Sequence, residues 1–279
     1  MQRFILRNML KEFFKEDIGR GDLTSEAVFD DNHQCEAVIT AKDDGLFAGE
    51  LVILEGFRLL DETIAVHMLK TDGEAVRKGE TIARLKGRAA SLMTGERVVL
   101  NLIQRMSGIA TLTKQSIIRL NDPNIAICDT RKTTPGLRIL EKYAVKTGGG
   151  SNHRFGLDGG IMIKDNHIAA CGSISKAVEK ARSACGHMVK IEVEIESEQE
   201  LHEAIEAGAD IIMFDNCPPE TVKAFAEMTP AGIITEASGG ISFENLPAYR
   251  GTGVHCISLG YLTHSAKSLD ISMNVDLKK

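Results

Sequence analysis

The chain has 279 residues, a length that allows one large domain or a barrel with a smaller companion domain. Its net charge of −6 argues against general nucleic-acid binding, which normally requires a basic excess on one face. No run approaches the roughly 20 apolar residues that span a bilayer, and the charged N-terminus does not resemble a secretory leader, so we expect a soluble protein with no membrane or nucleic-acid partner.

The first part of the chain predicts a small β-rich domain with helices, which we place at residues 1–108. Residues 2–16 carry apolar residues at helical spacing, and residues 16–29 are expected to form a loop. Short β-like runs follow, separated by Asp-Gly turns: AVITA, LFAGELVIL, TIAVHML and TIARLKG. Residues 95–120 return to helical spacing with few breakers, which predicts a long helix or a helix pair bridging two domains.

Residues 109–279 predict an α/β barrel domain, with the option that its C-terminal segment packs back on the N-terminal domain. The apolar runs IAICD, IMIKD, VKIEVEIE, DIIMFDN, GIITEA and HCISLG alternate with helical stretches. Such alternation is typical of βαβ units around a parallel sheet, either doubly wound or closed into a barrel. Each run ends in polar residues or glycine, and this favours a barrel, whose chemistry lies at the C-terminal ends of its strands.

The six cysteines are scattered along the chain, and none forms a C-x-x-C pair. Several stand inside apolar runs. This spacing indicates reduced thiols rather than a disulfide framework or a metal cage, so we expect a cytoplasmic protein.

The segment 129–167 is densely basic within an acidic protein. Guanidinium groups bind carboxylates and phosphates bidentately, and lysines add point charge, so the segment predicts a site for a small, highly anionic substrate. The candidates that stand beside strand ends or glycine-rich turns are Arg131, Lys132, Arg154 and Lys164. Lys142 and Lys146, in a helical stretch, are expected on a solvated surface instead.

Two glycine-containing loops follow the last two predicted strands, Ser238-Gly239-Gly240 and Ser258-Leu259-Gly260. Barrels commonly bind phosphate at these loops, where backbone N–H groups can approach an anion. The alternative, glycines that only serve tight turns between strand and helix, stays open.

In VKIEVEIE, charged and apolar residues alternate, so that Glu192, Glu194 and Glu196 share one face. Because helices cover the outside of a parallel barrel, this charged face must turn inward or find partners. Glu194 lies near its strand end and Asp215 ends the next strand, an arrangement suited to Mg²⁺. Two nearby carboxylates also suit an oxocarbenium-like transition state at a ribose.

Eight segments, in chain order, resemble quinolinate phosphoribosyltransferases over nearly the whole sequence. They are EDIGRGDLTS, ERVVLNLIQRMSGIAT, DTRKTTPGLRILEKYAVKTGGGSNHRFGL, IKDNHI, EVEIES, DIIMFDN, EASGGI and ISLGYLTHS. The resemblance implies an N-terminal open β-sandwich with helices, a seven-stranded α/β barrel and a homodimer. It also implies a Mg²⁺-dependent reaction of quinolinate with phosphoribosyl pyrophosphate, which yields nicotinate mononucleotide, pyrophosphate and carbon dioxide in de novo NAD biosynthesis.

By motif, the resemblance gives each candidate residue a role. The residues that resemble the grip on quinolinate and the substrate phosphates are Arg131, His153, Arg154 and Lys164. Lys132 resembles the group beside the reacting ring, where it would stabilise or protonate the carbon left after decarboxylation. Arg97 resembles an arginine donated to the partner subunit's site across the dimer.

The same resemblance covers the sugar and phosphate end of the site. Glu194 and Asp215 resemble the carboxylates near ribose and Mg²⁺. The residues that match the loops holding the 5′-phosphate are Ser238, Gly239 and Gly260. One departure from the family pattern is His255, which stands where an Asp is usual and leaves its local hydrogen bonding open.

Two alternatives stay open at this point. A related phosphoribosyltransferase-like protein associated with molybdenum transport shares the framework, although the complete set of TRKT, NHR and IKDNH motifs favours quinolinate. A non-catalytic barrel that binds anionic metabolites would also carry a basic cluster.

Overall fold

The computed structural model describes residues 1–30 and 32–276, which form two compact units. The first unit consists of residues 1–112, 136–148 and 266 onward. The second consists of residues 113–135 and 149–265. The segments 136–148 and 266 onward therefore belong to the first unit, although they lie after residue 113 in the sequence.

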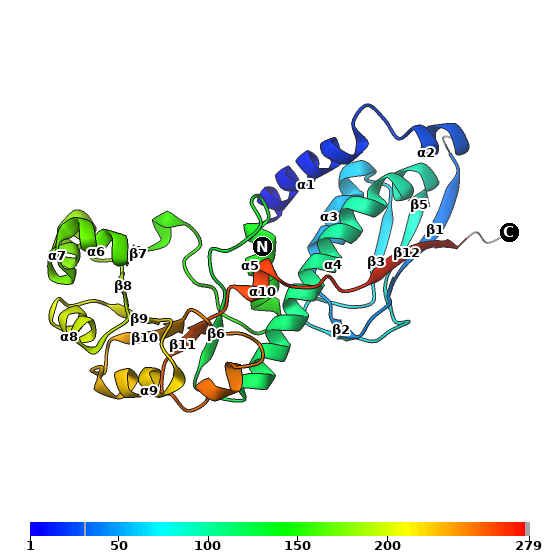
Figure 1. Ribbon diagram of the computed structural model, residues 1–279. Coiled ribbons are helices and arrows are strands. Elements are labelled where there is room, and N and C mark those ends of the chain that lie inside the picture. The colour runs from blue at the N-terminus through cyan, green and yellow to red at the C-terminus, as the bar shows by residue number, and fades with distance from the viewer. Residues whose placement is uncertain (31, 277–279) are drawn as a thin grey trace. The chain divides into compact units, whose positions relative to one another are not determined.

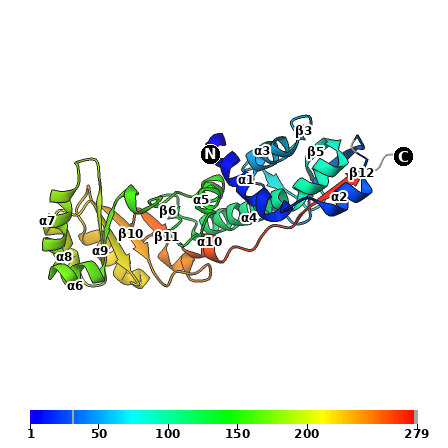
Figure 2. The ribbon, with the colours of Figure 1, turned by 90° about the horizontal axis from the view of Figure 1, so that it is seen from above.

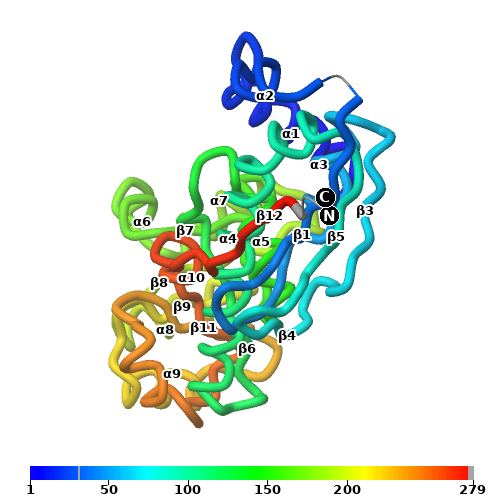
Figure 3. Tube along the Cα trace, turned by 90° about the vertical axis from the view of Figure 1, so that its right-hand side faces the viewer, coloured from blue at the N-terminus to red at the C-terminus, as the bar shows by residue number. Residues whose placement is uncertain are grey.

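A four-stranded antiparallel sheet forms the centre of the first unit. Its strands, in spatial order, are β12 (Ile271–Asp276), β1 (Gln34–Ala41), β5 (Thr81–Arg88) and β3 (Ala65–Met68), and Figure 3 shows them in this order. A second, two-stranded sheet pairs β2 (Gly45–Leu46) with β4 (Ala75–Val76). Every second residue of β1 is buried, which is how a strand with one face on a core alternates.

The first unit also contains helices. They are α1 (Arg3–Ile18), α2 (Leu23–Val28), α3 (Glu50–Leu60), α5 (Arg138–Thr147) and the part of α4 (Ala89–Leu120) that ends at Leu112. Figure 1 shows α3 and α4 side by side. A Cβ added to Gly56 of α3 would lie 2.8 Å from Cγ2 of Val99 in α4, so the two backbones approach closely.

Two expectations for the first unit are wrong. Residues 16–29 are not all loop, because they contain α2, whose N-terminus is capped by the Asp22 side chain accepting from the Ser25 N–H. The apolar run LFAGELVIL is mostly helix rather than strand. Within it begins α3, whose buried Val52, Ile53 and Phe57 have helical spacing, and a carboxylate oxygen of Asp72 accepts two backbone N–H groups at its start.

The second unit is built on a parallel sheet of six strands. In spatial order they are β6 (Ala126–Cys128), β11 (Cys256–Ser258), β10 (Ile234–Ser238), β9 (Ile211–Asp215), β8 (Ile191–Ile195) and β7 (Ile161–Ile163). All six coincide with the apolar runs predicted from the sequence. Consecutive strands from β7 to β11 are also neighbours in the sheet, as expected for βαβ units.

A seventh strand is expected, and a single residue takes its position. Ser151 forms an isolated parallel bridge with Cys128 of β6. The ladder goes no further because the N–H of His153 donates to the Asp129 carboxylate, at 2.9 Å, instead of to a neighbouring strand. The described residues therefore contain six parallel strands and one bridge.

Helices cover the outside of this sheet. They are α6 (Asp165–Cys171), α7 (Ile174–Ala184), α8 (Glu198–Glu206), α9 (Pro219–Met228) and α10 (Tyr261–His264), with the short 3₁₀ helices η1 (Leu157–Gly159) and η2 (Leu246–Tyr249). Figures 1 and 2 show α7, α8 and α9 outside the strands that they connect. Ile174 and Val178 of α7 and Leu201 of α8 are buried, which fits helices packed on a sheet by one face.

All six cysteines are free thiols, as their spacing predicts. Burial raises the pKa of Cys35 and of Cys217, so these thiols stay protonated and unreactive near neutral pH. In the described part of the chain, no helix is long and apolar enough to cross a membrane.

Gly108 in α4 provides a test of the packing in the first unit. A Cβ there would collide with the carbonyl oxygen of Lys267 and lie 3.0 Å from Cα of Ser268, whereas a Cβ at the exposed Gly186 would meet nothing within 4 Å. Helix propensity alone predicts that Gly108→Ala gains about 1 kcal/mol. We expect a loss of about 1–3 kcal/mol in the free energy of unfolding instead, measured by urea titration, because the contact is with backbone. Gly186→Ala is the control, and equal stability of the two variants would contradict the packing.

Candidate active site

Polar side chains collect at the carboxyl ends of the parallel strands of the second unit. Lys164 follows β7, Glu194 lies in β8, and Asp215 ends β9. The register pairs Asp215 with Ser238, the last residue of β10, so two predicted site residues lie on adjacent strands at the same level. Parallel strands bring their carboxyl ends to one edge, which is where α/β proteins place their sites.

The ammonium group of Lys164 forms a close ion pair with the carboxylate of Glu194. Burial raises the pKa of Glu194 and Lys164 opposes that rise, while the nearby carboxylates of Asp215 and Glu192 add to it. Glu194 therefore lies within electrostatic reach of a cation and of two other carboxylates. The sequence suggested that Glu194 and Asp215 are near each other, and the structure adds Lys164 to them.

The loops after β9 and β10 interlock through Asn216. This residue has a left-handed backbone, with φ of 54°, and its amide donates to the Asp215 carboxylate at 2.8 Å. Its own N–H donates to the carbonyl oxygen of Ser238 at 2.9 Å. A Cβ on Gly239 would collide with the Asn216 side chain and lie 2.7 Å from its backbone nitrogen, so only glycine fits there. Asn216 is a residue that the sequence reasoning missed.

Arg131 and Arg154 lie close enough to affect each other. The pKa of Arg154 is lowered first by burial and then by the positive charge of Arg131, and the carboxylates of Glu192 and Glu194 oppose this shift. The Arg154 guanidinium donates to the carbonyl oxygen of Gly160 at 2.9 Å. Among the described residues, its Nε has no hydrogen-bond partner, and such a buried donor is costly unless something else accepts from it.

Lys132 and Gly260 lie together, although they are far apart in sequence. The backbone carbonyl of Lys132 accepts from the Thr263 hydroxyl at 2.7 Å. A Cβ added to Gly260 would lie 3.1 Å from Cδ of Lys132, so the glycine leaves room for the lysine stem. The Lys132 side chain belongs to an exposed residue at the carboxyl end of β6, where it can reach a bound molecule.

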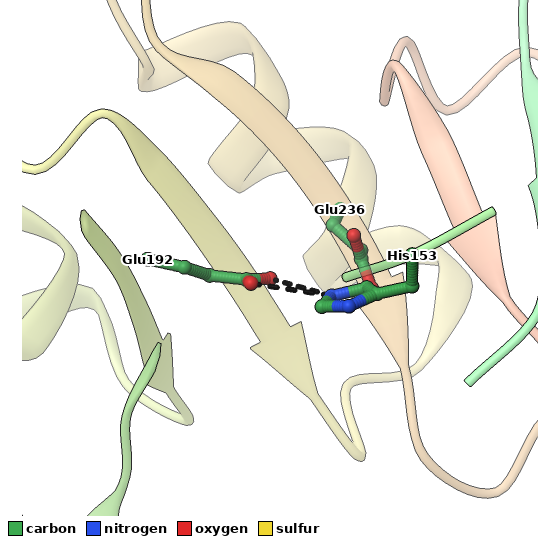
Figure 4. Close-up of side chains that lie close together, drawn as sticks. All are labelled: His153, Glu192 and Glu236. Atoms are coloured by element: carbon green, nitrogen blue, oxygen red, sulfur yellow. Dashed lines mark hydrogen bonds and ion pairs between the residues drawn. The ribbon is translucent and has the colours of Figure 1, made fainter. Parts of the chain in front are cut away.

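A buried cluster of His153, Glu192 and Glu236 lies among the strands (Figure 4). Nε2 of His153 is 3.2 Å from a carboxylate oxygen of Glu192 and 3.6 Å from one of Glu236. Burial, followed by the repulsion of Glu192, raises the pKa of Glu236 to about 7. Beside the cluster, the fully buried Asp129 accepts from the Asn152 amide at 2.6 Å and from the His153 N–H.

Of this cluster, the sequence reasoning assigned a role only to His153. The signal that pointed to Glu192 was its place on the charged face of β8, and the signal for Asp129 and Glu236 was a polar residue at the end of an apolar run. These signals identify inward-facing residues but cannot say which of them meet, because partners on different strands are set by the register.

Three other basic residues from the sequence analysis lie in the first unit, and they differ in how exposed they are. Arg97 belongs to the first unit, where it is exposed and its Nη2 lies 3.9 Å from Glu96. Lys146 is exposed as expected. The expectation that Lys142 is solvated is wrong, because its side chain is almost fully buried on the inner face of α5.

The hydrogen bonding of His255, which the sequence left open, is with Thr235. Its Nδ1 accepts from the backbone N–H of Thr235 at 3.0 Å and lies 2.9 Å from the Thr235 hydroxyl. The Asp that the family resemblance leads us to expect here would accept the same N–H between the starts of β10 and β11.

Comparison with known proteins agrees with this geometry. A family model described as the C-terminal domain of quinolinate phosphoribosyl transferase matches residues 109–274, and one described as its N-terminal domain matches residues 22–107. The chain belongs to the quinolinate phosphoribosyl transferase family. The matches cover both halves of the sequence, as the eight sequence segments suggested.

Relatives of this family are similar over nearly the full chain. A probable carboxylating nicotinate-nucleotide pyrophosphorylase of Bacillus subtilis is 65% identical over 277 residues, covering 99% of this chain and 96% of the relative. The carboxylating nicotinate-nucleotide pyrophosphorylase of Rattus norvegicus is 41% identical, covering 86% of this chain and 81% of the relative. The crystal structure of NadC from Streptococcus pyogenes superposes with a TM-score of 0.96 at 40% identity, covering 99% and 98% of the two chains.

Gly239 and Gly240 form a matched pair that tests the interlocked loops. Both have a positive φ, so an alanine at either position carries backbone strain, but a Cβ on Gly240 would come no closer to Asn216 than 4.0 Å. We expect Gly239→Ala to destabilise the protein by about 1–3 kcal/mol more than Gly240→Ala, because only the first adds overpacking. Chemical denaturation of the two variants measures the difference, and equal destabilisation would show that Asn216 does not constrain Gly239.

Proposed function

We propose that this chain transfers the phosphoribosyl group of phosphoribosyl pyrophosphate to quinolinate and releases pyrophosphate and carbon dioxide, leaving nicotinate mononucleotide. The observation that carries the proposal is that Arg154, whose buried Nε has no hydrogen-bond partner among the described residues, lies near a second guanidinium group, that of Arg131. Nearby Glu192 and Glu194 offset part of this positive charge, and an anion bound by both arginines would offset more of it. Quinolinate, with carboxylates on adjacent ring carbons, supplies that anion.

Each end of the site suits one substrate. Arg131 and Arg154, with Lys132, face the pyridine dicarboxylate, since guanidinium groups bind carboxylates bidentately. The backbone N–H groups of the Ser238 to Gly240 and Gly260 loops are the candidates to bind a phosphate, and the two glycines after Ser238 have positive φ. Lys164 reaches the phosphates while its ion pair with Glu194 sets its position.

The carboxylates of Glu194 and Asp215 fit the Mg²⁺ ion that the family resemblance implies. Mg²⁺ prefers oxygen ligands and commonly uses one or two carboxylates together with substrate phosphates. Burial raises the pKa of Glu194 and the charge of Asp215 adds to that rise, so a cation between the two carboxylates would relieve their repulsion. When bound, Mg²⁺ would supply neutralisation of the negative charge on the pyrophosphate.

The chemistry then follows from charge. The pyridine nitrogen forms a bond to the anomeric carbon as the bond from that carbon to pyrophosphate breaks, and Glu194 and Asp215 stabilise the positive charge that develops on the ribose. The resulting pyridinium accepts the electron pair released when the bond to the 2-carboxylate breaks and carbon dioxide leaves. A proton then adds to that carbon. In this proposal Lys132 either stabilises the negative charge on the carbon or donates the proton.

The assembly and location are part of the proposal. We propose a homodimer in which Arg97, exposed on the first unit, extends to the partner subunit's site. The free thiols of the chain are typical of a reducing compartment, which supports a cytoplasmic location.

Substrate choice tests the function. We expect pyrophosphate release from phosphoribosyl pyrophosphate with quinolinate, and a rate lower by up to about 10⁴-fold with nicotinate, because nicotinate lacks the 2-carboxylate that the arginines are proposed to bind. A coupled pyrophosphate assay measures both rates. Comparable turnover of nicotinate would contradict the proposed recognition, and no turnover with quinolinate would favour a non-catalytic anion-binding barrel.

A mixed dimer tests the role of Arg97. Arg97→Ala and Lys132→Ala should each be inactive, and in a mixed dimer both lesions fall in one site if Arg97 acts across the interface. Random co-refolding should then restore up to about a quarter of wild-type activity per site, since half the dimers are mixed and each has one intact site.

The same mixture provides its own control. Heterodimer formation is checked with two affinity tags on the two variants. If heterodimers form and the mixture stays as inactive as its parents, Arg97 acts within its own subunit.

A further inference from the structure

The buried cluster of His153, Glu192 and Glu236 contains more charge than packing requires. The side chains are 11%, 5% and 5% exposed, with Glu192 in β8, Glu236 in β10 and His153 in the segment that follows the Ser151 bridge. Two carboxylates buried side by side are costly, and apolar residues of similar volume would fill the same space at lower cost. Both carboxylates approach the same donor group, the His153 ring (Figure 4).

The hydrogen bonds of His153 determine where its proton lies. Nδ1 accepts the backbone N–H of Arg154 at 2.7 Å, so a neutral ring carries its proton on Nε2. That N–H points toward the carboxylates of Glu192, at 3.2 Å, and Glu236, at 3.6 Å. A metal-binding nitrogen must present a lone pair instead. The cluster therefore has the polarity of a hydrogen-bonded group, although its three ligand-type atoms lie within 4.8 Å of one another.

The same ring connects the cluster to Arg154. Two further hydrogen bonds fix residues 153 and 154. The Asp129 carboxylate accepts from the His153 N–H at 2.9 Å, and the Arg154 guanidinium donates to the carbonyl oxygen of Gly160 at 2.9 Å. With both ring nitrogens of His153 engaged inside the protein, the ring orients its neighbour. Arg154 is thus the end of a chain of contacts that begins at the buried carboxylates.

We propose that Glu192 and Glu236 are positioning residues that anchor the His153 ring, and that this ring holds the Arg154 backbone so that its guanidinium is preorganised for a substrate carboxylate. The inference rests on the proposed function. It assigns His153 a positioning role in place of the direct contact with substrate that the family resemblance implies. Preorganisation of a binding group lowers the cost of ordering it when the ligand arrives.

Two variants of Glu192 separate positioning from packing. Glu192→Leu fills similar space but accepts no hydrogen bond, whereas Glu192→Gln keeps an acceptor oxygen for Nε2–H. We expect Glu192→Leu to raise the KM for quinolinate by roughly tenfold, which corresponds to about 1.4 kcal/mol, with the KM for phosphoribosyl pyrophosphate within about twofold of wild type. Glu192→Gln should restore the KM for quinolinate to within about threefold of wild type.

A double-mutant cycle shows whether Glu192 acts through His153. In a His153→Ala background, Glu192→Leu should change the KM for quinolinate by less than about twofold, because the ring that transmits its effect is gone. An undiminished effect in that background overturns the proposal, as does a Glu192→Leu variant that lowers kcat alone. Glu55→Gln, which changes a buried and ion-paired carboxylate of the first unit, controls for a general effect of removing buried charge.

Folding and function are checked separately. Circular dichroism and thermal unfolding establish that each variant is folded, and Glu236→Leu and Glu236→Gln replace the Glu192 pair if Glu192→Leu does not fold. Wild-type protein is assayed first with quinolinate and phosphoribosyl pyrophosphate. No wild-type turnover would refute the proposed function, whereas wild-type turnover with equal KM values for the Leu and Gln variants would refute only the positioning role.

Discussion

The second unit depends on how buried carboxylates are satisfied among parallel strands. Helices cover the outer side of the sheet, so a strand such as β8 that alternates charged and apolar residues must direct its charged ones inward. Asp129, Glu192 and Glu236 are each less than 5% exposed. A carboxylate in such surroundings requires a hydrogen-bond donor, a cation or a proton. Most of the polar geometry of the site follows from that requirement.

The carboxylates meet this requirement differently at different depths. Asp129 takes backbone and amide N–H groups, Glu192 lies beside the His153 ring, and burial raises the pKa of Glu236 so that a proton can neutralise it. Nearer to solvent, Glu194 pairs with Lys164. Cations and carboxylates therefore lie near one another at the strand ends, where burial and then the charge of Arg131 lower the pKa of Arg154. Such an arrangement is suited to an anionic molecule that joins them.

Backbone conformation fixes the other side of the site. Asn216 adopts a left-handed conformation that is uncommon for a residue with a side chain, and its contacts with Asp215 and Ser238 hold it there. Strained residues of this kind persist only where their surroundings determine them, and they gather at functional sites. Position 239 in the neighbouring loop must be glycine, because any larger residue would collide with Asn216. The position of the Asp215 carboxylate thus depends on two loops at once.

Local features of the sequence were sufficient for much of the architecture. All six parallel strands and the helices α7, α8 and α9 follow from hydrophobic period and composition, because each element is specified by its own residues. Predictions were wrong where a short run of residues was compatible with both a strand and a helix. The apolar run at the start of α3 has the composition of a strand, and only the continuation to Phe57 and the capping oxygen of Asp72 make it a helix. The burial of Lys142 was equally hidden, since a lysine in a helical stretch gives no sign of the face it occupies.

The candidate site also has features that the sequence predicted and features that only the structure shows. Arg131, Arg154, Lys164, Glu194 and Asp215 could be named from the sequence, because charged residues at strand ends are visible one strand at a time and long motifs carried the family resemblance. Which of them meet was decided only by the tertiary structure. The contacts of Glu192 and Glu236 with His153, and the fit of Gly239 against Asn216, join residues that are 23 to 83 positions apart and depend on strand register and on hydrogen-bond direction. Neither quantity is encoded in any single segment.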